Sequence, residues 1–415
     1  MSRRTAMVGA LLAMYFFSYF QRTSPAVIAP YLIQDFSLNA AELGLLSSIY
    51  FYTYAVIQAP LGPLLDFIGP RIVITILGAI AAVGSLIFAL APSFTQCLIG
   101  RGLVGLGMGS VLMGTITLIA VWYPPRFFAT LAGWVFAVGN IGGLMATLPL
   151  ALLSRSLGWR NSFLLLAIIA FFIVAAVWIT VRDYPPDQAQ QRGKAKGSFE
   201  AKQAYRLLLG SISFWKIAIL NFFLLGSFFA ILSLWGGPFL NDVFGMTPAG
   251  AGTILVSMTM GMIIGNPFIG FLYDRLAPHA RKRMDLIFFG LYILPLFLFC
   301  AVLRPGRDFL LFPVYFGLGL LASSGLLLIA RLKAIYPPQI LGTALTLNNF
   351  FGFGGVAVLQ YLMGLIIGRY PHVGNAYPLE AYRSAFYLPL AGLIISFLFY
   401  TCLKDSPSSP TSRQK

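Results

Sequence analysis

Long apolar stretches constrain the fold of this chain more than any other feature of its sequence. A helix needs about 20 apolar residues to cross the hydrocarbon core of a bilayer, and only 10% of the residues here are charged. Twelve stretches meet this requirement, at 6–32, 40–64, 71–92, 94–122, 127–153, 161–181, 213–238, 248–273, 284–303, 309–332, 340–368 and 384–403. The shorter alternating segments of a membrane β-barrel are absent. We therefore predict an all-α membrane protein with twelve transmembrane helices.

The positive charge of the chain, formally +16, is explained by membrane topology. If the amino terminus is inside, 20 of the 28 Lys and Arg residues lie on that side and six lie in the opposite loops. The positive-inside rule then places both termini in the cytoplasm of a multi-pass protein of the cell (inner) membrane. This distribution argues against nucleic acid as a partner and leaves the lipid bilayer as the main one. The first stretch is too long for the apolar core of a signal peptide, so we expect it to be retained.

An internal repeat divides the chain into two similar units. At an offset of 208 residues, Gly62 meets Gly270, Leu64 meets Leu272 and Asp66 meets Asp274, and Pro30 and Gly44 also meet identical residues. We therefore predict two pseudo-symmetric bundles of six helices. The predicted divisions are an N-terminal bundle at 1–181, a cytoplasmic linker at 182–211, a C-terminal bundle at 212–403 and a tail at 404–415.

The residues that carry most enzyme chemistry are sparse. The three cysteines, at 97, 300 and 402, are isolated in apolar segments, and the two histidines, at 279 and 372, fall in loops. No metal site, cofactor site or nucleophile can be assembled from them. We expect a protein that is not an enzyme and that uses no cofactor.

Arg22 is the most informative residue because it lies inside the first apolar stretch. Its side chain lies roughly 24 Å along a core about 30 Å thick. A charge at that depth is costly unless it faces water or a partner. Tyr15, Tyr19 and Arg22 share one helical face, which we interpret as a cavity wall. The alternative is that Arg22 extends outward to the interface or braces a neighbouring carbonyl. Against this alternative, Pro25 and Pro30 loosen the helix just above and free carbonyls beside the guanidinium.

The second stretch carries a polar and aromatic stripe, with Ser47, Tyr50, Tyr54 and Gln58 at helical spacing. So many polar groups would be costly against lipid, so we expect the stripe to face the same cavity. Packing between helices explains an aromatic stripe equally well. At the start of this stretch, Asn39 and Glu42 have the spacing of a capping box.

The second half offers amide and indole candidates for a binding site. Asn221 and Trp235 lie on one face of the seventh stretch, and Asn349 and Gln360 share a face of the eleventh. Buried amides bind ligands, or they hydrogen-bond between helices. The repeat partner of Arg22 is Ala230, so the two halves differ in charge at this level.

The segment GPLLDFIGPR at 62–71 and its copy GFLYDR at 270–275 lie where apolar stretches end. Each carries an aspartate that could accept a hydrogen bond from a basic side chain or a helix amino terminus. We interpret both segments as latches that hold one conformation and release in another, although a static helix cap is the alternative. The gating candidates are Gly62, Asp66, Gly69, Arg71, Gly270, Asp274 and Arg275.

These segments resemble the signature loop of the major facilitator superfamily, G-x-L-x-D-R-x-G-R-R/K. Phe67 and Pro70 depart from the pattern in the first copy, and Ala277 departs from it in the second. The run RGLVGLGMG at 101–109 resembles a second signature of the family, and we assign its Arg101 to bracing or coupling of helices. The resemblance implies a transporter that works by alternating access, in which the two bundles rock about a central site. We expect a monomer.

The spacing of RTSPAVIAP at 22–30 resembles the organic-anion branch of the superfamily, which includes organophosphate:phosphate antiporters and hexonate or sialate symporters. In that branch the Arg receives the carboxylate or phosphate of the substrate, a role that a planar guanidinium suits. The acidic residue that often precedes the Arg is here Gln21, and all 12 acidic residues fall in loops or near span ends. We therefore predict exchange or facilitated passage of a small organic anion without proton coupling. Efflux of amphipathic, drug-like compounds and transport of amino acids or other metabolites remain alternatives.

Overall fold

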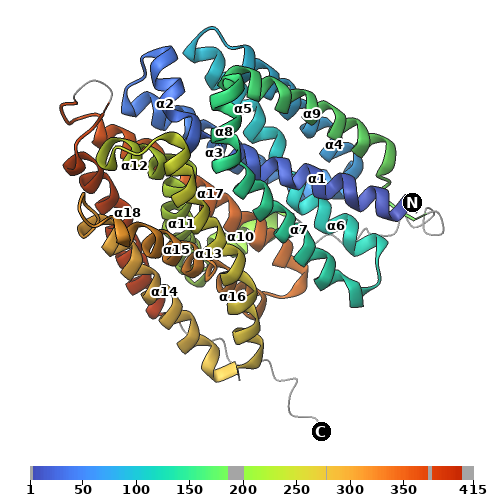
Figure 1. The fold of residues 1–415 in the computed structure, drawn as a ribbon. Coiled ribbons are helices and arrows are strands. Elements are labelled where there is room, and N and C mark those ends of the chain that lie inside the picture. The colour runs from blue at the N-terminus through green and yellow to red at the C-terminus, as the bar shows by residue number, and fades with distance from the viewer. Residues whose placement is uncertain (1–2, 186–200, 277, 373–375, 404–415) are drawn as a thin grey trace.

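The computed structural model describes residues 3–185, 201–276, 278–372 and 376–403, which are organised almost entirely as helices (Figure 1). The elements of the first part are α1 (Arg3–Thr23), α2 (Pro25–Phe36), α3 (Ala40–Phe67), α4 (Pro70–Leu90), α5 (Phe94–Met108), α6 (Val111–Trp122), α7 (Pro125–Met145), α8 (Leu148–Leu157), α9 (Trp159–Thr180) and α10 (Ala201–Leu209). Those of the second part are α11 (Ile212–Ala230), the π-helix η2 (Ile231–Trp235), α12 (Gly236–Phe244), α13 (Pro248–Arg275), α14 (Pro278–Ala301), the 3₁₀ turn η3 (Asp308–Leu310), α15 (Leu311–Ala322), α16 (Gly325–Ile335), α17 (Pro338–Ile367) and α18 (Leu379–Thr401).

Helices able to cross a membrane dominate the described residues. Ten are long and apolar enough by length and composition, and the pair α7 and α8, which bends by 42°, adds an eleventh if it counts as one span. The first apolar stretch, which forms α1 and α2, is not among them. The all-α prediction is confirmed, whereas the count of twelve spans is not confirmed by this criterion.

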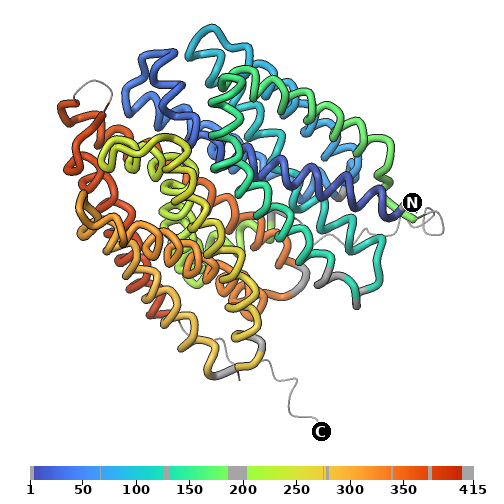
Figure 2. The backbone as a smooth tube through the Cα atoms, in the orientation of Figure 1, coloured from blue at the N-terminus to red at the C-terminus, as the bar shows by residue number. Residues whose placement is uncertain are grey.

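The helices form two groups that lie side by side (Figure 2). In the first group, α1 packs on α7 and α4 lies between α5 and α9. In the second group, α11 packs on α17 and α18, and α13 packs on α15. Between the groups, α3 and α17 make the most extensive contact. Residues on these two helices are therefore placed at the centre of the molecule.

The end of the molecule that carries Arg4, Gly69 and Pro337 is called the terminal face, and the end that carries Asn39 and Gly245 is called the opposite face. Near the opposite face, helices of the two groups approach with their backbones close together. A Cβ atom on Gly237 of α12 would collide with the Ala26 carbonyl oxygen of α2. Pro30 lacks an N–H, so the Ala26 carbonyl has no donor within its own helix. Glycine at 237 thus allows the close approach of α2 and α12.

Helices α3 and α17 also meet near the opposite face through small residues. A Cβ atom on Gly44 would lie 2.9 Å from the Gln360 carbonyl oxygen, and one on Gly364 would meet the carbonyl of Ala40. The Ala40 amide donates to Tyr377 Oη at 3.2 Å. The predicted capping box at the start of α3 is confirmed, since Asn39 and Glu42 bond reciprocally at 2.9 Å.

The segment between α3 and α4 makes a turn, and Gly69 is the residue in it that requires glycine. Its φ of 98° lies in the left-handed region that other residues rarely adopt. Gly62 and Gly270, in contrast, lie within helices, and a Cβ atom on either would meet no atom within 4 Å. Neither glycine makes a close contact in this structure, and their assignment as gating residues stays a prediction.

Arg71 binds within its own group of helices. Its backbone N–H donates to Asp183 Oδ1 at 2.7 Å, and its guanidinium donates to the Trp178 carbonyl at 3.0 Å and lies 4.2 Å from the Trp178 ring centroid. Asp183 is a partner that the sequence did not indicate. The side chains of Asp66 and Asp274 lie outside the described residues, and Arg275 lies over the Phe271 ring at 3.9 Å. The latch interpretation of both segments stays a prediction.

We expect Gly69→Ala to lower the free energy of unfolding by about 1–3 kcal/mol, the cost of a non-glycine residue at such a φ. An added Cβ would also lie 2.8 Å from Asp183 Oδ2 and would disturb its bond to Arg71. Thermal unfolding of the purified protein measures this. Gly62→Ala, in open space within α3, is the matched control and should melt at or slightly above wild type. Equal melting of both variants would show that the turn tolerates a side chain.

The segment before α11 contains the helix α10, which packs against α17 and α11. Tyr205 donates to the Ala59 carbonyl of α3 at 2.7 Å. Pro63, four residues after Ala59, has no N–H, so this carbonyl needs a donor from outside its helix. Burial raises the pKa of the Tyr205 hydroxyl, which keeps the proton it donates. Part of the segment predicted as the linker, residues 201–209, is therefore a helix that contacts helices of both groups.

Candidate functional site

Arg22 lies in the last turn of α1, where the chain breaks before α2. Pro25 begins α2 and supplies no N–H to the Gln21 carbonyl, so the helix cannot continue unchanged. The Arg22 side chain is 2% exposed. The carbonyl end of a helix carries a partial negative charge, which favours a cation at this position.

Four aromatic rings surround the Arg22 guanidinium. Its central carbon lies 4.6 Å from the Tyr19 ring centroid, 5.0 Å from that of Tyr54, 5.3 Å from that of Phe229 and 4.7 Å from that of Phe353. We call these four residues the aromatic box. Tyr19 and Tyr54 come from α1 and α3, and Phe229 and Phe353 come from α11 and α17. The charge therefore lies between the two groups of helices and does not face lipid.

Cation–π contacts stabilise the guanidinium without neutralising it. Each contributes about 0.5–2 kcal/mol, depending on desolvation. Arg22 Nε is buried without a hydrogen-bond partner, and Arg22 forms no ion pair among the described residues. The box therefore holds a net positive charge and an N–H group that an acceptor could bind. The alternatives for Arg22, extension to the interface or bracing of a carbonyl, do not describe this geometry.

The other predicted tyrosines lie directly behind the box. Tyr15 packs edge-on against Tyr19, with ring centroids 5.2 Å apart, and Tyr50 stacks on Tyr54 at 6.0 Å. Tyr50 also donates to the Ser18 carbonyl at 3.4 Å. All four tyrosines are buried. The structure thus brings together the predicted faces of the first two apolar stretches.

None of the predicted candidates of the second half is among the rings that surround the Arg22 guanidinium. Asn221 donates to the Asn348 carbonyl at 2.9 Å. The Trp235 indole donates to the Gln360 carbonyl at 3.0 Å, and the Gln360 amide donates to Ser233 Oγ at 2.8 Å. Their polar groups join helices α11, η2 and α17. Asn349 is partly buried, and no hydrogen bond of its side chain is described.

Phe229 and Phe353 are the site residues that the sequence reasoning missed. Phe353 lies four residues after Asn349 and seven before Gln360, so it shares their helical face. Phe229 precedes Ala230, the repeat partner of Arg22. The shared face of Asn349 and Gln360 and the position of Ala230 were both visible in the sequence. They indicated polar residues and not the neighbouring phenylalanines.

Arg101 braces the break between α1 and α2. Its Nη1 donates to the Gln21 carbonyl at 3.0 Å, the carbonyl that Pro25 leaves without a donor. The Gln21 amide donates in turn to Ser85 Oγ at 3.2 Å. This bond to a carbonyl of a neighbouring helix is what bracing requires, and a coupling role for Arg101 stays a prediction. Through Gln21, it fixes the backbone next to Arg22.

Carboxylates and metal-binding side chains contribute nothing to this region in the part of the chain that the structure describes. No group of three or more His, Cys, Asp or Glu side chains could hold a metal ion there. Asp285 is fully buried, but it accepts from Arg331 Nε at 2.9 Å and Nη2 at 2.6 Å, and from Tyr400 Oη at 3.1 Å. That carboxylate lies within the second group of helices and has its own cation.

Comparison with known proteins identifies similar chains. The family model described as Major Facilitator Superfamily matches residues 11–332 and 238–415. The probable sulfoacetate transporter of Cupriavidus necator is 22% identical over 284 residues, which span 66% of this chain and 65% of that protein. The nitrite extrusion protein of Bacillus subtilis is 22% identical over 80% of this chain and 85% of that protein. A bacterial homologue of the human lysosomal transporter Spinster, solved inward-facing and unoccupied, is 21% identical with a TM-score of 0.74 over 96% of each chain.

Proposed function

Because this chain belongs to the major facilitator superfamily, we propose that it carries a small organic anion across the membrane by alternating access. Twelve spans arise if α1 with α2, α5 with α6, α7 with α8, α11 with α12, and α15 with α16 each count as one. They form an N-terminal bundle at 1–181 and a C-terminal bundle at 212–403, joined by the cytoplasmic linker. The protein acts as a monomer in the cell (inner) membrane.

The observation that carries the anion proposal is the buried Arg22 guanidinium between the two halves. It has an Nε without a partner and no carboxylate in salt-bridge distance among the described residues. A planar guanidinium offers two parallel N–H groups to a carboxylate or a phosphate ester. The names of two relatives, a sulfoacetate transporter and a nitrite extrusion protein, support a small anion. An uncompensated cation repels cationic drugs, which disfavours the efflux alternative.

The distribution of positive charges indicates which face of the molecule lies on which side of the membrane. The positive-inside rule assigns the terminal face to the cytoplasm and the opposite face to the outside. In this assignment, the close backbone contacts at Gly44 and Gly237 close the outer side. Opening the outer side would separate Phe229 and Phe353 from Arg22 and expose its guanidinium to an entering anion. The segments with Asp66 and Asp274 would then close the cytoplasmic side.

Proton coupling would need a carboxylate that alternates between free and bound states. Asp285 is held by Arg331 and Tyr400, and Asp242 accepts from Tyr382 Oη at 2.6 Å and from the Tyr377 N–H at 3.1 Å. Neither carboxylate touches the aromatic box. We therefore propose exchange or facilitated passage without a proton.

Transport by purified protein in liposomes tests this proposal. Liposomes loaded with one unlabelled anion are diluted into the same labelled anion, over a panel of carboxylates, phosphate esters, sulfoacetate, nitrite and cationic dyes. We expect counterflow of at least one anion and none of the dyes. An imposed pH gradient alone should drive no accumulation. Movement of dyes without anions would support efflux instead, and uphill uptake on a pH gradient would contradict the uncoupled mode.

A further inference from the structure

Helix α10, which precedes the second group of helices, is fastened to that group. It packs against α11 and α17. The Trp215 indole of α11 donates to the Leu209 carbonyl at the end of α10, at 2.8 Å. The Tyr336 hydroxyl, between α16 and α17, donates to Ser211 Oγ at 2.8 Å. These contacts hold α10 against the second group, so we expect the two to move together.

Tyr205 connects α10 to the first group of helices. Its hydroxyl donates to the Ala59 carbonyl of α3 at 2.7 Å, which is the one hydrogen bond between α10 and the first group among the described residues. Pro63 has no N–H, so α3 itself supplies no donor to this carbonyl. A side chain that belongs to the second group thus satisfies a backbone acceptor of the first.

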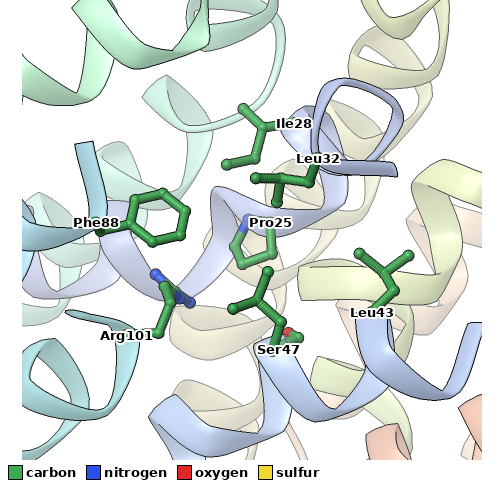
Figure 3. A pocket seen from close by; sticks show the side chains of 8 residues that line it. Pro25, Ile28, Leu32, Leu43, Ser47, Phe88 and Arg101 are labelled. Atoms are coloured by element: carbon green, nitrogen blue, oxygen red, sulfur yellow. The ribbon is translucent and has the colours of Figure 1, made fainter. Parts of the chain in front are cut away.

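The first group of helices is packed too tightly for Ala59 to move by itself. Figure 3 shows a void beside Arg101 in this group, whose volume is only about 10 Å³ and whose lining is mainly apolar, with Leu43 and Phe88 among its residues. Interiors packed in this way deform little, and the bundles of a transporter move largely as rigid bodies. The Ala59 carbonyl therefore changes its position relative to α10 when one group moves against the other.

The position of Ala59 along α3 makes its bond to α10 sensitive to that movement. Gly44, near the opposite face, lies against the Gln360 carbonyl of α17. Ala59 lies 15 residues further along α3, which is roughly 22 Å, and Tyr54 at the aromatic box lies between them. A rotation that separates the groups at Gly44 moves Ala59 in the opposite sense. A bond of 2.7 Å is lost once it lengthens by about 1 Å.

We propose that Tyr205 is a positioning residue of the transport cycle. Its hydroxyl holds the two groups in the arrangement that closes the opposite face, and it releases the Ala59 carbonyl when that face opens. The segment between the two bundles is then part of the moving machinery and not only a covalent connection. This inference rests on the proposed alternating access, but it does not depend on which solute is carried.

Labelling of a single cysteine tests this role without any transported solute. Ile33 lines the hollow where α2 meets α12, so Ile33→Cys, in full-length protein whose native cysteines are replaced, reports opening of the opposite face to an impermeant maleimide. Tyr205→Phe removes only the hydroxyl. We expect it to speed labelling roughly three- to tenfold, the effect of one hydrogen bond on a two-state equilibrium. Cooperative melting of the variant checks that it is folded.

Tyr123→Phe is the matched control. The Tyr123 hydroxyl donates to the Arg4 carbonyl at 3.4 Å, and both ends of this bond lie in the first group. Its loss should therefore leave the labelling rate unchanged. If Tyr205→Phe also labels at the wild-type rate, the proposed role of Tyr205 is wrong, whatever counterflow shows. Absence of counterflow in the wild type would instead contradict the anion proposal and leave the labelling result standing.

A second variant tests whether the Ala59 carbonyl is the acceptor that matters. Pro63→Ala restores an N–H that can donate to this carbonyl within α3, so the carbonyl no longer depends on Tyr205. In the Pro63→Ala background, Tyr205→Phe should change the labelling rate by less than about twofold, because two changes that remove the same interaction are not additive. A full three- to tenfold effect in that background would show that the hydroxyl acts elsewhere, and it would overturn the proposal.

Discussion

Arg22→Ala is expected to reduce anion transport by roughly 100-fold or more, the largest effect of any single substitution at the site. The estimate assumes loss of two charge-assisted hydrogen bonds of about 1.5–3 kcal/mol each. Arg22→Lys keeps the charge but loses the paired N–H groups, so we expect an intermediate reduction of roughly tenfold. Initial rates of counterflow in proteoliposomes, measured over a range of anion concentrations, give these ratios.

The transport rates of the Arg22 variants need a control that removes an arginine elsewhere in the protein. Arg155 in α8 is exposed, so Arg155→Ala should transport at the wild-type rate. Each variant must remain monodisperse and melt cooperatively, so that a loss of transport is not a loss of folding. If Arg22→Ala retained transport within about threefold of wild type, the guanidinium would not be the anion site.

The part of the site on the first two apolar stretches could be predicted because helical periodicity is local. Tyr15, Tyr19 and Arg22 repeat at intervals of four and three residues, and Tyr50 and Tyr54 repeat at four. Each interval places side chains on one face. Burial of a charge then indicated which face turns inward. Both steps use only neighbouring residues, so the sequence sufficed for them.

The contribution of the second half could not be predicted in the same way. Which residue of α17 lies opposite Arg22 depends on how far α17 slides along α3, and that register is set by the contacts of Gly44 and Gly364. Without the register, the prediction of binding residues in the second half relied on polarity, which indicated Trp235 and Gln360. The Trp235 indole donates to the backbone carbonyl of Gln360, and the Gln360 side chain donates to Ser233 Oγ. Phe353, an apolar residue, lies at the charge instead.

The partners of the carbonyls at the break in the first span could also be predicted only in part. Pro25 and Pro30 were visible in the sequence, and the carbonyls they free were expected beside the guanidinium. The side chain that donates to the Gln21 carbonyl could not be inferred from neighbouring residues. Arg101, 80 positions away, takes it, and the backbone of α12 approaches the Ala26 carbonyl. The Gln21 carbonyl thus accepts a hydrogen bond within the first group of helices, whereas the Ala26 carbonyl lies at the contact between the two groups.

That contact between halves leads to the second large expected effect. Gly237→Val is expected to reduce transport about thirtyfold, because the added side chain collides with the Ala26 carbonyl when α2 and α12 close. Overpacking of this kind costs about 2 kcal/mol, and a cost of that size shifts a two-state equilibrium about thirtyfold. Binding of the anion to the outward-open state does not need the contact. Anion affinity, measured by thermal shift, should therefore stay within about threefold of wild type.

Accessibility at the opposite face separates a shifted equilibrium from a damaged site. A hollow of about 270 Å³ between α2 and α12, lined by Ile33 and Asn241, lies at this face. In a background with the three native cysteines replaced, Ile33→Cys should react faster with an impermeant maleimide when Gly237→Val is present. Gly133→Val is the control, since a Cβ at Gly133 meets no atom within 4 Å, and it should change neither rate. Unchanged labelling together with lost transport would mean that Gly237 acts on the anion site and not on closure of this face, because only closure requires α2 and α12 to touch.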